Sequence, residues 1–485
     1  MSLALATLGL LAPAPQSVIE VIPFTPDPGW YVPALISGDG GQAVRSFTQG
    51  NPELERFDPA SGIELISLPA GASSASLVAL SWGGDDIVLT ADVGAGRSYF
   101  RLDQQSAATL LQLPMDALVA GASNDLGVIV GHTQIGFSCA AGCTAFRSNG
   151  TTSTLLSPLP GGGDGALVYG CSGDGSFIVG ESSSQAFPNR EACIWDASGQ
   201  PTGLGVSAGA SRSIARAVSD DGSVVGGEVL VGDQWRPARW TPVGGAEVLF
   251  PDLGFVTDVS ADGRTILGIT PFTLPGENWG FLWTEATGYV PFRQYLEALQ
   301  VPGHDDWEFL HPLSMSDDGS VFVARGRRTA SSGPQETSRI ELDRSTVGDI
   351  GCTGGQPNST GKSGLLNAFG SAAVQDTRLS LVASQLPLQQ TCMLVAAPAL
   401  GPGVALPGSN GTLCLTGTLG RDLSTITSSG PGATAVFAVD PSAIPQPNGP
   451  VAGAPGETWH FQVWHRDLTT VQTSNTTHSV SVTLL

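Results

Sequence analysis

The sequence predicts an all-β protein in which a seven-bladed β-propeller of four-stranded blades is followed by a β-sandwich. Three observations support this fold class: a repeated turn motif, few charged residues, and abundant glycine and proline. Only 13% of the 485 residues are charged, while 64 are glycine and 34 are proline. Such a composition is typical of many short strands joined by tight turns, and it argues against coiled coils and charged helical bundles.

A short pattern of serine, aspartate and glycine recurs along the first two thirds of the chain. The strongest copy is Ala215–Gly227, and clear copies lie at Cys171–Gly180 and Val259–Gly268. The turn glycines that mark the seven units are Gly40, Gly84, Gly127, Gly175, Gly222, Gly263 and Gly319. Their mean spacing is about 46 residues, and repeats of roughly 40–50 residues with several strands each are typical of propeller blades. The sequence therefore predicts seven blades within residues 17–345.

Each repeat is expected to form four strands, a to d, with the Asp-Gly turn between strands a and b. Glycine suits this turn because it tolerates the positive φ that tight hairpins require. In the fifth repeat the predicted strands are Ile214–Ser219, Ser223–Val229, Pro237–Thr241 and Ala246–Phe250. The aromatic residue near the end of strand c is expected to pack between blades.

The seventh repeat provides strands a, b and c, but no strand d follows them. The apolar segment Val18–Pro23 precedes the first complete repeat and has no partner there. We therefore predict that this segment is the fourth strand of the seventh blade, since such closure removes an open sheet edge. One helix is expected, at Pro291–Gln300, because its apolar residues recur at helical spacing, and it is expected to cap one face.

The Ser-x-Asp-Gly-Ser-Val-Val-Gly core at Ser219–Gly226, together with a following Ala-x-x-Trp strand, resembles the bacterial extracellular HAF repeats. The Tyr295–Leu299 insertion before the last repeat is also similar to that family. The resemblance covers roughly residues 18–345 and implies an exported, propeller-like protein from a group mostly without assigned activity. The second repeat departs from the pattern, because its turn reads Ser-Trp-Gly-Gly-Asp-Asp at Ser81–Asp86.

The composition changes after Asp343, and residues 346–485 are predicted to form a β-sandwich. Seven or eight short strands with one buried face each are typical of that architecture. The candidate strands are Arg378–Gln385, Thr391–Ala397, Thr412–Thr416, Leu423–Ser428, Thr434–Val439, Thr458–His465 and Ser479–Leu484. Residues 344–364 are expected to form a linker and an entry strand.

This second part resembles a module that recurs at the C-terminus of large secreted bacterial proteins. The matching residues are Cys352 with Pro357–Gly361, then Cys414–Gly417, Gly456–Asp467 and Thr473–Asn475. The module is attached to many unrelated domains, and the resemblance therefore implies sorting, anchoring or cohesion rather than chemistry. It also implies a disulfide between Cys352 and Cys414, which leaves Cys392 unpaired.

The N-terminus and the cysteines indicate export. Residues 1–16 contain an apolar run followed by small residues and are predicted to be a signal peptide, although the usual positive charges are missing. The run is too short to span a membrane, which needs roughly 20 apolar residues. Among the seven cysteines, Cys139 and Cys143 could close a small loop. Cys171 and Cys193 are expected to be buried free thiols, because an intervening strand holds them too far apart.

The candidate ligand-binding residues are Trp235, Trp279, Arg325, Arg327 and Arg328, on one face of the propeller. The connections between strands b and c are long in the third to seventh repeats, and rigid scaffolds commonly bind through such loops. Those predicted loops are His132–Thr144, Glu181–Glu191, Val229–Arg236, Thr270–Asn278 and Arg325–Glu336. Aromatic and arginine side chains are frequent anchors of binding surfaces. The alternative is that these side chains merely fill the rim.

The charge balance excludes nucleic acid as a partner and leaves three functions open. The formal net charge is −22, with 43 acidic and 21 basic residues, and Lys362 is the single lysine. Such a surface repels phosphates. No cofactor is expected, and the six histidines show no spacing typical of a metal site. We expect non-catalytic binding of an extracellular protein or glycan, with a polysaccharide hydrolase or lyase and a structural matrix component as alternatives.

Overall fold

The computed structural model describes most of the chain between residues 17 and 485. The described residues are 17–24, 34–47, 53–94, 96–133, 143–163, 165–242, 244–270, 280–329, 335–343, 346–353, 356–421, 423–430, 432–468 and 473–485. The predicted signal peptide at residues 1–16 lies outside them.

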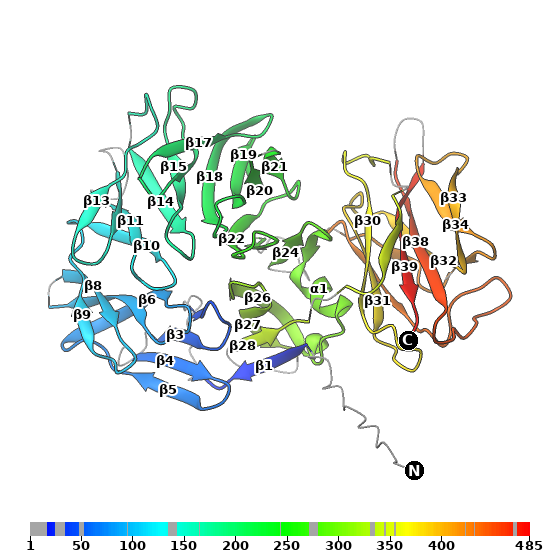
Figure 1. Ribbon diagram of the computed structural model, residues 1–485, viewed down its shortest axis with the longest axis horizontal. Helices are drawn as coiled ribbons and strands as arrows, with labels where there is room; N and C mark the ends of the chain where they lie inside the picture. The colour runs from blue at the N-terminus through cyan, green and yellow to red at the C-terminus, as the bar shows by residue number, and fades with distance from the viewer. Residues whose placement is uncertain are drawn as a thin grey trace, which may run out of the picture.

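Seven four-stranded antiparallel sheets follow one another in a ring, which confirms the predicted propeller (Figure 1). The first three blades comprise β2 (Ala34–Ile36), β3 (Ala43–Phe47), β4 (Glu53–Asp58) and β5 (Gly62–Ile66); β6 (Ala72–Leu80), β7 (Ile87–Val93), β8 (Gly96–Leu102) and β9 (Ala108–Leu110); β10 (Ala117–Ala122), β11 (Ile129–Thr133), β12 (Thr144–Ser148) and β13 (Ser153–Leu155). The next three comprise β14 (Ala166–Cys171), β15 (Ile178–Ser182), β16 (Glu191–Trp195) and β17 (Pro201–Gly205); β18 (Ala210–Val218), β19 (Val225–Val231), β20 (Gln234–Thr241) and β21 (Gly245–Val248); β22 (Phe255–Val259), β23 (Thr265–Ile269), β24 (Phe281–Thr284) and β25 (Gly288–Pro291).

The seventh blade is closed by the N-terminal strand, as the sequence predicted. It consists of β26 (Trp307–Met315), β27 (Val321–Arg328), β28 (Glu336–Glu341) and β1 (Val18–Ile22). β1 pairs antiparallel with β28, with Val18 opposite Glu341 and Ile22 opposite Thr337. Ile22 is only 3% exposed, so the strand contributes to the core as well as to the sheet.

The repeated turn owes its shape to its serine and aspartate. In the fifth blade the Ser219 hydroxyl donates to Asp221 Oδ1 at 2.7 Å and accepts the Val224 N–H at 3.0 Å. The N–H of Ser223 also donates to Asp221 Oδ1, at 2.9 Å. Gly222 has φ +69°, a value at which a side chain would be strained. The sequence pattern is therefore a self-contained turn, and the carboxylate serves the turn rather than a ligand.

The seven a–b turns are joined by a ring of hydrogen bonds that runs from each blade to the next. The bonds are Asp39 N to Trp82 O, Trp82 N to Asn124 O, Asn124 N to Gly173 O, Gly173 N to Asp220 Oδ1, Asp220 N to Ala261 O, Ala261 N to Asp317 O, and Asp317 N to Gly38 O. Asn124 also donates from its side chain to Asp317 Oδ2 at 2.5 Å, across the ring from the third blade to the seventh. This end of the propeller is thus held tightly, and we name it the a–b face.

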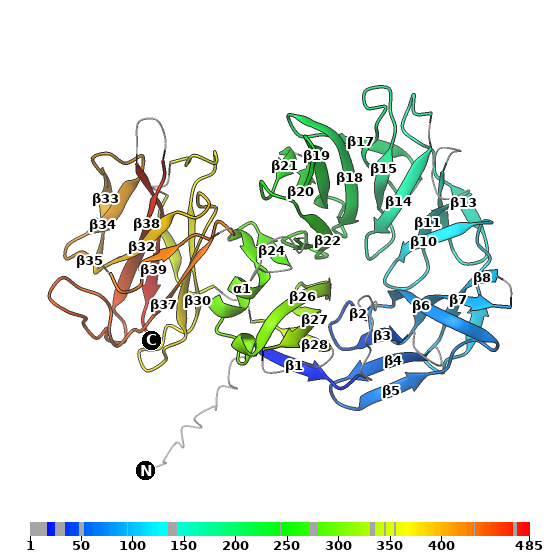
Figure 2. The same ribbon diagram turned by 180° about the vertical axis from the view of Figure 1, so that it is seen from behind.

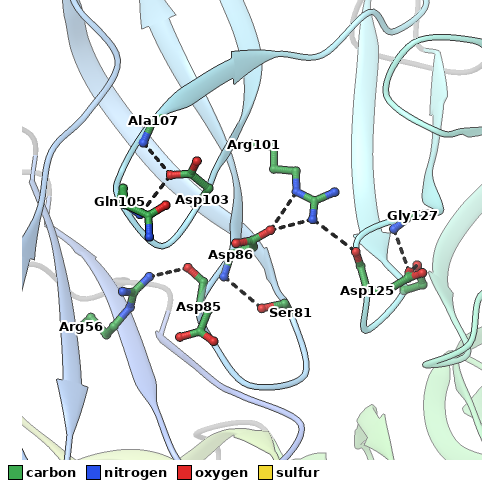
Figure 3. Close-up of polar contacts among 11 residues, drawn as sticks. Arg56, Ser81, Asp85, Asp86, Arg101, Asp103, Gln105, Ala107, Asp125 and Gly127 are labelled. Atoms are coloured by element: carbon green, nitrogen blue, oxygen red, sulfur yellow. Dashed lines mark hydrogen bonds and ion pairs between the residues drawn. The ribbon is translucent and has the colours of Figure 1, made fainter.

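Arginines at the outer end of this face hold neighbouring blades together (Figure 3). Arg56 of the first blade donates to the backbone carbonyl of Asp85 in the second blade at 2.8 Å. Arg101 of the second blade binds Asp86 Oδ2 at 2.6 Å and reaches the carbonyl of Asp125 in the third blade at 3.5 Å. The second blade is complete although its turn lacks the usual aspartate, because the Ser81 hydroxyl still accepts the N–H of Asp86 at 3.0 Å.

The predicted helix is present, but it does not cap a face of the propeller. α1 (Phe292–Ala298) is followed by a short 3₁₀ turn, η2 (His304–Asp306). α1 lies at the side of the ring, between blades six and seven and the second domain (Figures 1 and 2). Its buried residues Tyr295 and Leu296 belong to one apolar cluster with Phe369 and Val382 of that domain, which explains the placement. Within the described residues, no helix is both long and apolar enough to cross a membrane.

The second domain is a sandwich of two main sheets. The larger sheet contains β29 (Asp349–Cys352), β39 (Ser474–Thr483), β38 (Thr458–Arg466), β32 (Thr391–Ala397), β35 (Gly420–Arg421) and β36 (Thr427–Ser428). The smaller contains β30 (Leu365–Gly370), β31 (Leu379–Ser384) and β37 (Ala435–Val439), and a hairpin joins β33 (Ala399–Ala405) to β34 (Thr412–Thr416). The predicted strand Leu423–Ser428 is wrong over most of its length, because only its last two residues pair. The sequence also missed β30 and β33.

The smaller sheet packs on both faces, so the two domains are docked rather than loosely linked. In β31, Leu381 and Ala383 face the sandwich core, whereas Val382 joins the cluster around α1. Asn367 donates to the carbonyl of Ala286 at 2.7 Å. The single lysine, Lys362, reaches back to blade five, to Glu247 Oε1 at 3.3 Å.

Candidate functional site

On the face opposite the a–b turns, which we name the b–c face, the loop predicted at Val229–Arg236 is wrong, because β19 and β20 extend through it and are joined by only Gly232 and Asp233. The first residues of the loop predicted at Arg325–Glu336 also belong to a strand, because β27 continues to Arg328. Gly232 supplies the positive φ that the tight turn between β19 and β20 requires. The central parts of the loops expected at 132–144, 270–278 and 325–336 lie outside the described residues.

Trp235 lies on β20, where it is partly buried and opposite Leu230. The guanidinium of Arg212 lies over its ring, 5.5 Å from the centroid. Trp279 lies outside the described residues. Of the two predicted tryptophans, only Trp235 can therefore be placed, and an arginine that the sequence reasoning did not select is its partner.

The three predicted arginines share one strand, β27 of the seventh blade, where two of them are engaged with neighbours. Arg327 forms a bidentate ion pair with Glu308, in which Nε donates to Oε2 at 2.6 Å and Nη2 donates to Oε1 at 2.8 Å. Arg328 donates to Glu336 at 3.0 Å. Arg325 is 8% exposed and lies opposite His311. The structure therefore brings these arginines together with each other, but they belong to a different blade from Trp235.

A buried polar cluster between blades four and five is the most distinctive group on the b–c side. Glu181, at the end of β15, is fully buried. Arg212, at the start of β18 in the next blade, binds both of its carboxylate oxygens, with Nη2 at 2.7 Å from each and Nε at 3.0 Å from Oε2. Tyr169 of β14 donates its hydroxyl to Glu181 Oε1 at 3.1 Å, and Arg190 Nη1 lies 3.7 Å from the same oxygen.

A second buried glutamate orients a second arginine in the same cluster. Glu228 of β19 is fully buried, and its Oε1 accepts from Arg216 Nε at 2.7 Å. The other carboxylate oxygen is buried with no hydrogen-bond partner among the described residues. The guanidinium of Arg216 lies 4.3 Å above the ring of Tyr169. Burial raises the pKa of Glu228 to about 7, and the charge of Arg216 offsets only part of that effect.

His132 of the third blade extends the cluster on its far side. Its ring meets that of Tyr169 edge to face at 6.4 Å, and its Nδ1 lies 3.2 Å from the carbonyl of Val168. Burial lowers the pKa of His132, so the ring is neutral near pH 7. Burial, together with the nearby charge of Glu181, raises the pKa of Tyr169 above its usual value, and the phenol keeps its proton. The charged groups of the cluster are therefore the glutamates and arginines.

The sequence reasoning missed this cluster although the repeats contain a signal for it. His132, Glu181 and Glu228 each stand nine positions after the turn serine of their repeat, namely Ser123, Ser172 and Ser219. Arg325 stands at the same position after Ser316. This position falls near the end of strand b, directly after an apolar run that packs between blades. Ionisable residues at an equivalent position in four repeats would have indicated a polar layer inside the ring.

The cysteines divide into bonded and free groups. Cys352 and Cys414 form a disulfide with their Cα atoms 6.1 Å apart. Cys143 is also disulfide-bonded, whereas Cys139, with which it was expected to pair, lies outside the described residues. Cys171, Cys193 and Cys392 are free thiols; Cys193 and Cys392 are buried and Cys171 is partly exposed.

No group of three or more candidate metal ligands gathers anywhere in the described part of the chain. His304 belongs to the short turn η2, and its Nε2 lies 3.2 Å from Asp305 Oδ1. His311 lies on β26 and faces Arg325, and burial together with that arginine lowers the pKa of His311 to about 4. The histidines therefore serve local contacts.

The chemistry that the cluster between blades four and five supports is the binding of an anion. It places three arginines, Arg190, Arg212 and Arg216, against two glutamates, Glu181 and Glu228. The balance is one net positive charge even with both carboxylates ionised, in a chain whose formal net charge is −22. Arg212 and Arg216 are each about one third exposed, at 34% and 33%, while both glutamates are fully buried. The glutamates thus hold the arginines, and the arginines face outward.

Comparisons with known proteins show similarity of fold. No protein-family model matches the chain, and no curated protein matches it. Among solved structures, TolB from Acinetobacter baumannii is 16% identical with a TM-score of 0.32, over 44% of this chain and 52% of that chain. An oligogalacturonate lyase in complex with manganese is 13% identical with a TM-score of 0.41, over 68% and 91%. An oligogalacturonate lyase from Vibrio parahaemolyticus is 10% identical with a TM-score of 0.44, over 68% and 92%. At these identities the likeness concerns the β-propeller architecture alone, and this chain is a β-propeller protein.

Proposed function

We propose that this protein is a secreted propeller that binds an extracellular protein or glycan through its b–c face and catalyses no reaction there. The observation that carries the proposal is the pair of partly exposed arginines on β18, Arg212 and Arg216, the first of which lies against the aromatic ring of Trp235. Rigid arginine and aromatic side chains are typical anchors of binding surfaces, because they lose little conformational freedom on binding.

A binding screen of the full chain on glycan arrays, together with pull-downs of extracellular proteins, tests the proposal. Trp235→Ala removes the aromatic surface beside Arg212 and is expected to weaken binding. Trp82→Ala is the matched control, because Trp82 is 54% exposed on the a–b face. Equal loss of binding in both variants, or no ligand for the wild type, would contradict the proposal.

The alternative is an enzyme that acts on polysaccharide, and one observation favours it. Glu228, with its pKa raised to about 7, lies in one cluster with Tyr169 and His132, and acid–base catalysis uses such groups. A glycoside hydrolase, however, needs two carboxyl groups that reach the substrate from opposite sides. Glu181 and Glu228 are both fully buried behind arginines, so we place binding first. Release of reducing ends or unsaturated sugars from polysaccharides by the wild type, and its loss in Glu228→Gln, would reverse the order.

We further propose that the protein is exported and that the sandwich domain serves anchoring or sorting. The disulfide between Cys352 and Cys414 supports an oxidising compartment, since such bonds persist mainly outside the cytosol. The docking of the sandwich against α1 means that an anchored protein would present its propeller in a fixed orientation. Fractionation of cells that express the full chain tests this, and recovery from the cytosol alone would contradict it.

A further inference from the structure

Two contacts position Arg216, and its terminal nitrogens are left unused. Its Nε donates to Glu228, and its plane lies over the ring of Tyr169. Among the described residues, its two terminal nitrogens have no hydrogen-bond partner. A guanidinium carries five N–H donors in a rigid plane, so four of them remain available here. This is the arrangement of a group that is already oriented for a ligand rather than one that completes an internal network.

Arg212 belongs to the same strand and has a donor to spare. It precedes Arg216 by four positions on β18, and a β-bulge between Ala215 and Ala217 falls at Arg216 itself. Arg212 uses Nε and Nη2 on Glu181, and Nη1 has no partner in the part of the chain that the structure describes. Both arginines are therefore fixed by fully buried carboxylates and present free N–H groups.

The shape of the available donors selects a carboxylate. The two terminal nitrogens of a guanidinium match the two oxygens of a carboxylate in a pair of parallel hydrogen bonds. An aromatic ring also lies next to the donors, because the guanidinium of Arg212 lies 5.5 Å from the ring centroid of Trp235. A ligand with a carboxylate on one edge and an apolar ring face fits both features, and an acidic sugar has that form.

We infer that Arg216, supported by Arg212, binds the carboxylate of a uronic acid residue in an acidic glycan. The inference rests on the proposed function and names its ligand class. Glu228 and Glu181 act as positioning residues, since they orient the arginines without reaching the ligand. Trp235 provides the aromatic surface against which the sugar ring packs.

The test is titration calorimetry of the full chain with a uronic acid tetrasaccharide and with the same tetrasaccharide after reduction of its carboxyl groups. Arg216→Lys keeps the charge but loses the paired donors, and we expect its affinity for the acidic sugar to fall roughly tenfold or more. Arg264→Lys is the matched control, because Arg264 lies on the a–b face and its side chain is 84% exposed. The Arg264→Lys variant should bind the acidic tetrasaccharide with the affinity of the wild type. The reduced tetrasaccharide should bind neither to the wild type nor to this variant.

The double variant Arg216→Gln, Glu228→Gln is a second test. It removes both charges of the ion pair at once and so leaves no unpaired buried charge that could cause misfolding. Its thermal transition should remain, and its binding should be lost. Equal affinity for the acidic and reduced sugars, or unchanged affinity in Arg216→Lys, would overturn the inference. An acidic peptide of equal charge that binds in place of the sugar would overturn the ligand class but leave the proposed function standing. If no sugar binds while Trp235→Ala still abolishes capture of another ligand, only the inference fails.

Discussion

Replacing Glu228 by glutamine should make the propeller more stable, and the gain should depend on pH. Glutamine keeps the shape of the side chain and an oxygen that can accept from Arg216, but it carries no charge. The pKa of Glu228 rises from 4.5 to about 7 in the folded protein because the carboxylate is fully buried. Folding therefore disfavours the ionised form of Glu228. Between pH 4.5 and about 7 the carboxyl group keeps its proton in the folded state and loses it in the unfolded state.

The size of the effect follows from the shift in pKa. A rise of roughly 2.5 units corresponds to about 3 kcal/mol, at about 1.4 kcal/mol per unit. Below pH 4.5 the carboxyl group is protonated in both the folded and the unfolded state, so its ionisation costs the wild type no stability relative to the Glu228→Gln variant. As the pH rises from 4.5 to 7, the wild type loses this stability progressively, and above pH 7 the full difference remains.

The assay is a thermal melt of wild type and Glu228→Gln across this pH range. With an unfolding entropy of roughly 2 cal/mol/K per residue, about 3 kcal/mol in a propeller of this size corresponds to a difference in Tm of about 4 °C. Glu247→Gln provides a control of opposite sign. Burial of Glu247 is outweighed by Arg239 and Lys362, which lower its pKa, so that substitution should cost stability near neutral pH. A Tm difference for Glu228→Gln that stays constant with pH, or that reverses sign, would refute the reasoning.

Three further predictions address the ring, the sandwich and the binding site. Deletion of residues 17–23 should abolish the cooperative melting transition of the propeller, because β28 loses all five of its paired residues on β1. A melting curve unchanged from that of the wild type, measured by circular dichroism, would contradict this. Cys414→Ser should lower the free energy of unfolding of the sandwich, measured in urea, by about 4 kcal/mol. The reason is that the disulfide closes a loop with a sequence separation of 62 and so restricts the unfolded chain. A loss below about 1 kcal/mol would argue against that cause. The affinity for the acidic tetrasaccharide, measured by calorimetry, should rise as the pH falls through about 7, because Glu228 gains a proton and the cluster gains one net positive charge next to Arg216. An affinity independent of pH would contradict this linkage.

The repeat accounts for most of what could be predicted about the fold. Turn glycines such as Gly222 mark each hairpin, because the required backbone conformation is local to a few residues. Because the last repeat lacks a fourth strand, the sequence indicated that the segment around Val18–Ile22 pairs there and closes the ring, and β1 does pair with β28. The second domain was harder to divide into strands. β33 contains Gly401, Pro402 and Gly403, which read as a loop, yet it pairs with β34 around a shift in register.

The candidate site was harder to predict because it depends on contacts between blades. Trp235 was selected from its residue type and position, but its partner Arg212 was not, and nothing in the local sequence distinguishes Arg212 from other arginines. Arg327 and Arg328 were selected for the same reasons, and the structure engages them with Glu308 and Glu336. Whether an arginine is free to bind depends on which carboxylates its neighbours present, and those neighbours come from other strands.

The sequence by itself determined the all-β class, the seven repeats, the closure of the ring and the presence of a second β domain. These properties follow from turn chemistry and from periodic burial, which act over a few residues. Only the tertiary structure decided that Glu181 meets Arg212 across a blade boundary and that Arg216 keeps its outer donors free. It also decided that α1 joins the two domains instead of capping the ring. The physical reason is that these contacts depend on how twisted sheets pack against one another, and residues that are distant in sequence then share one buried environment.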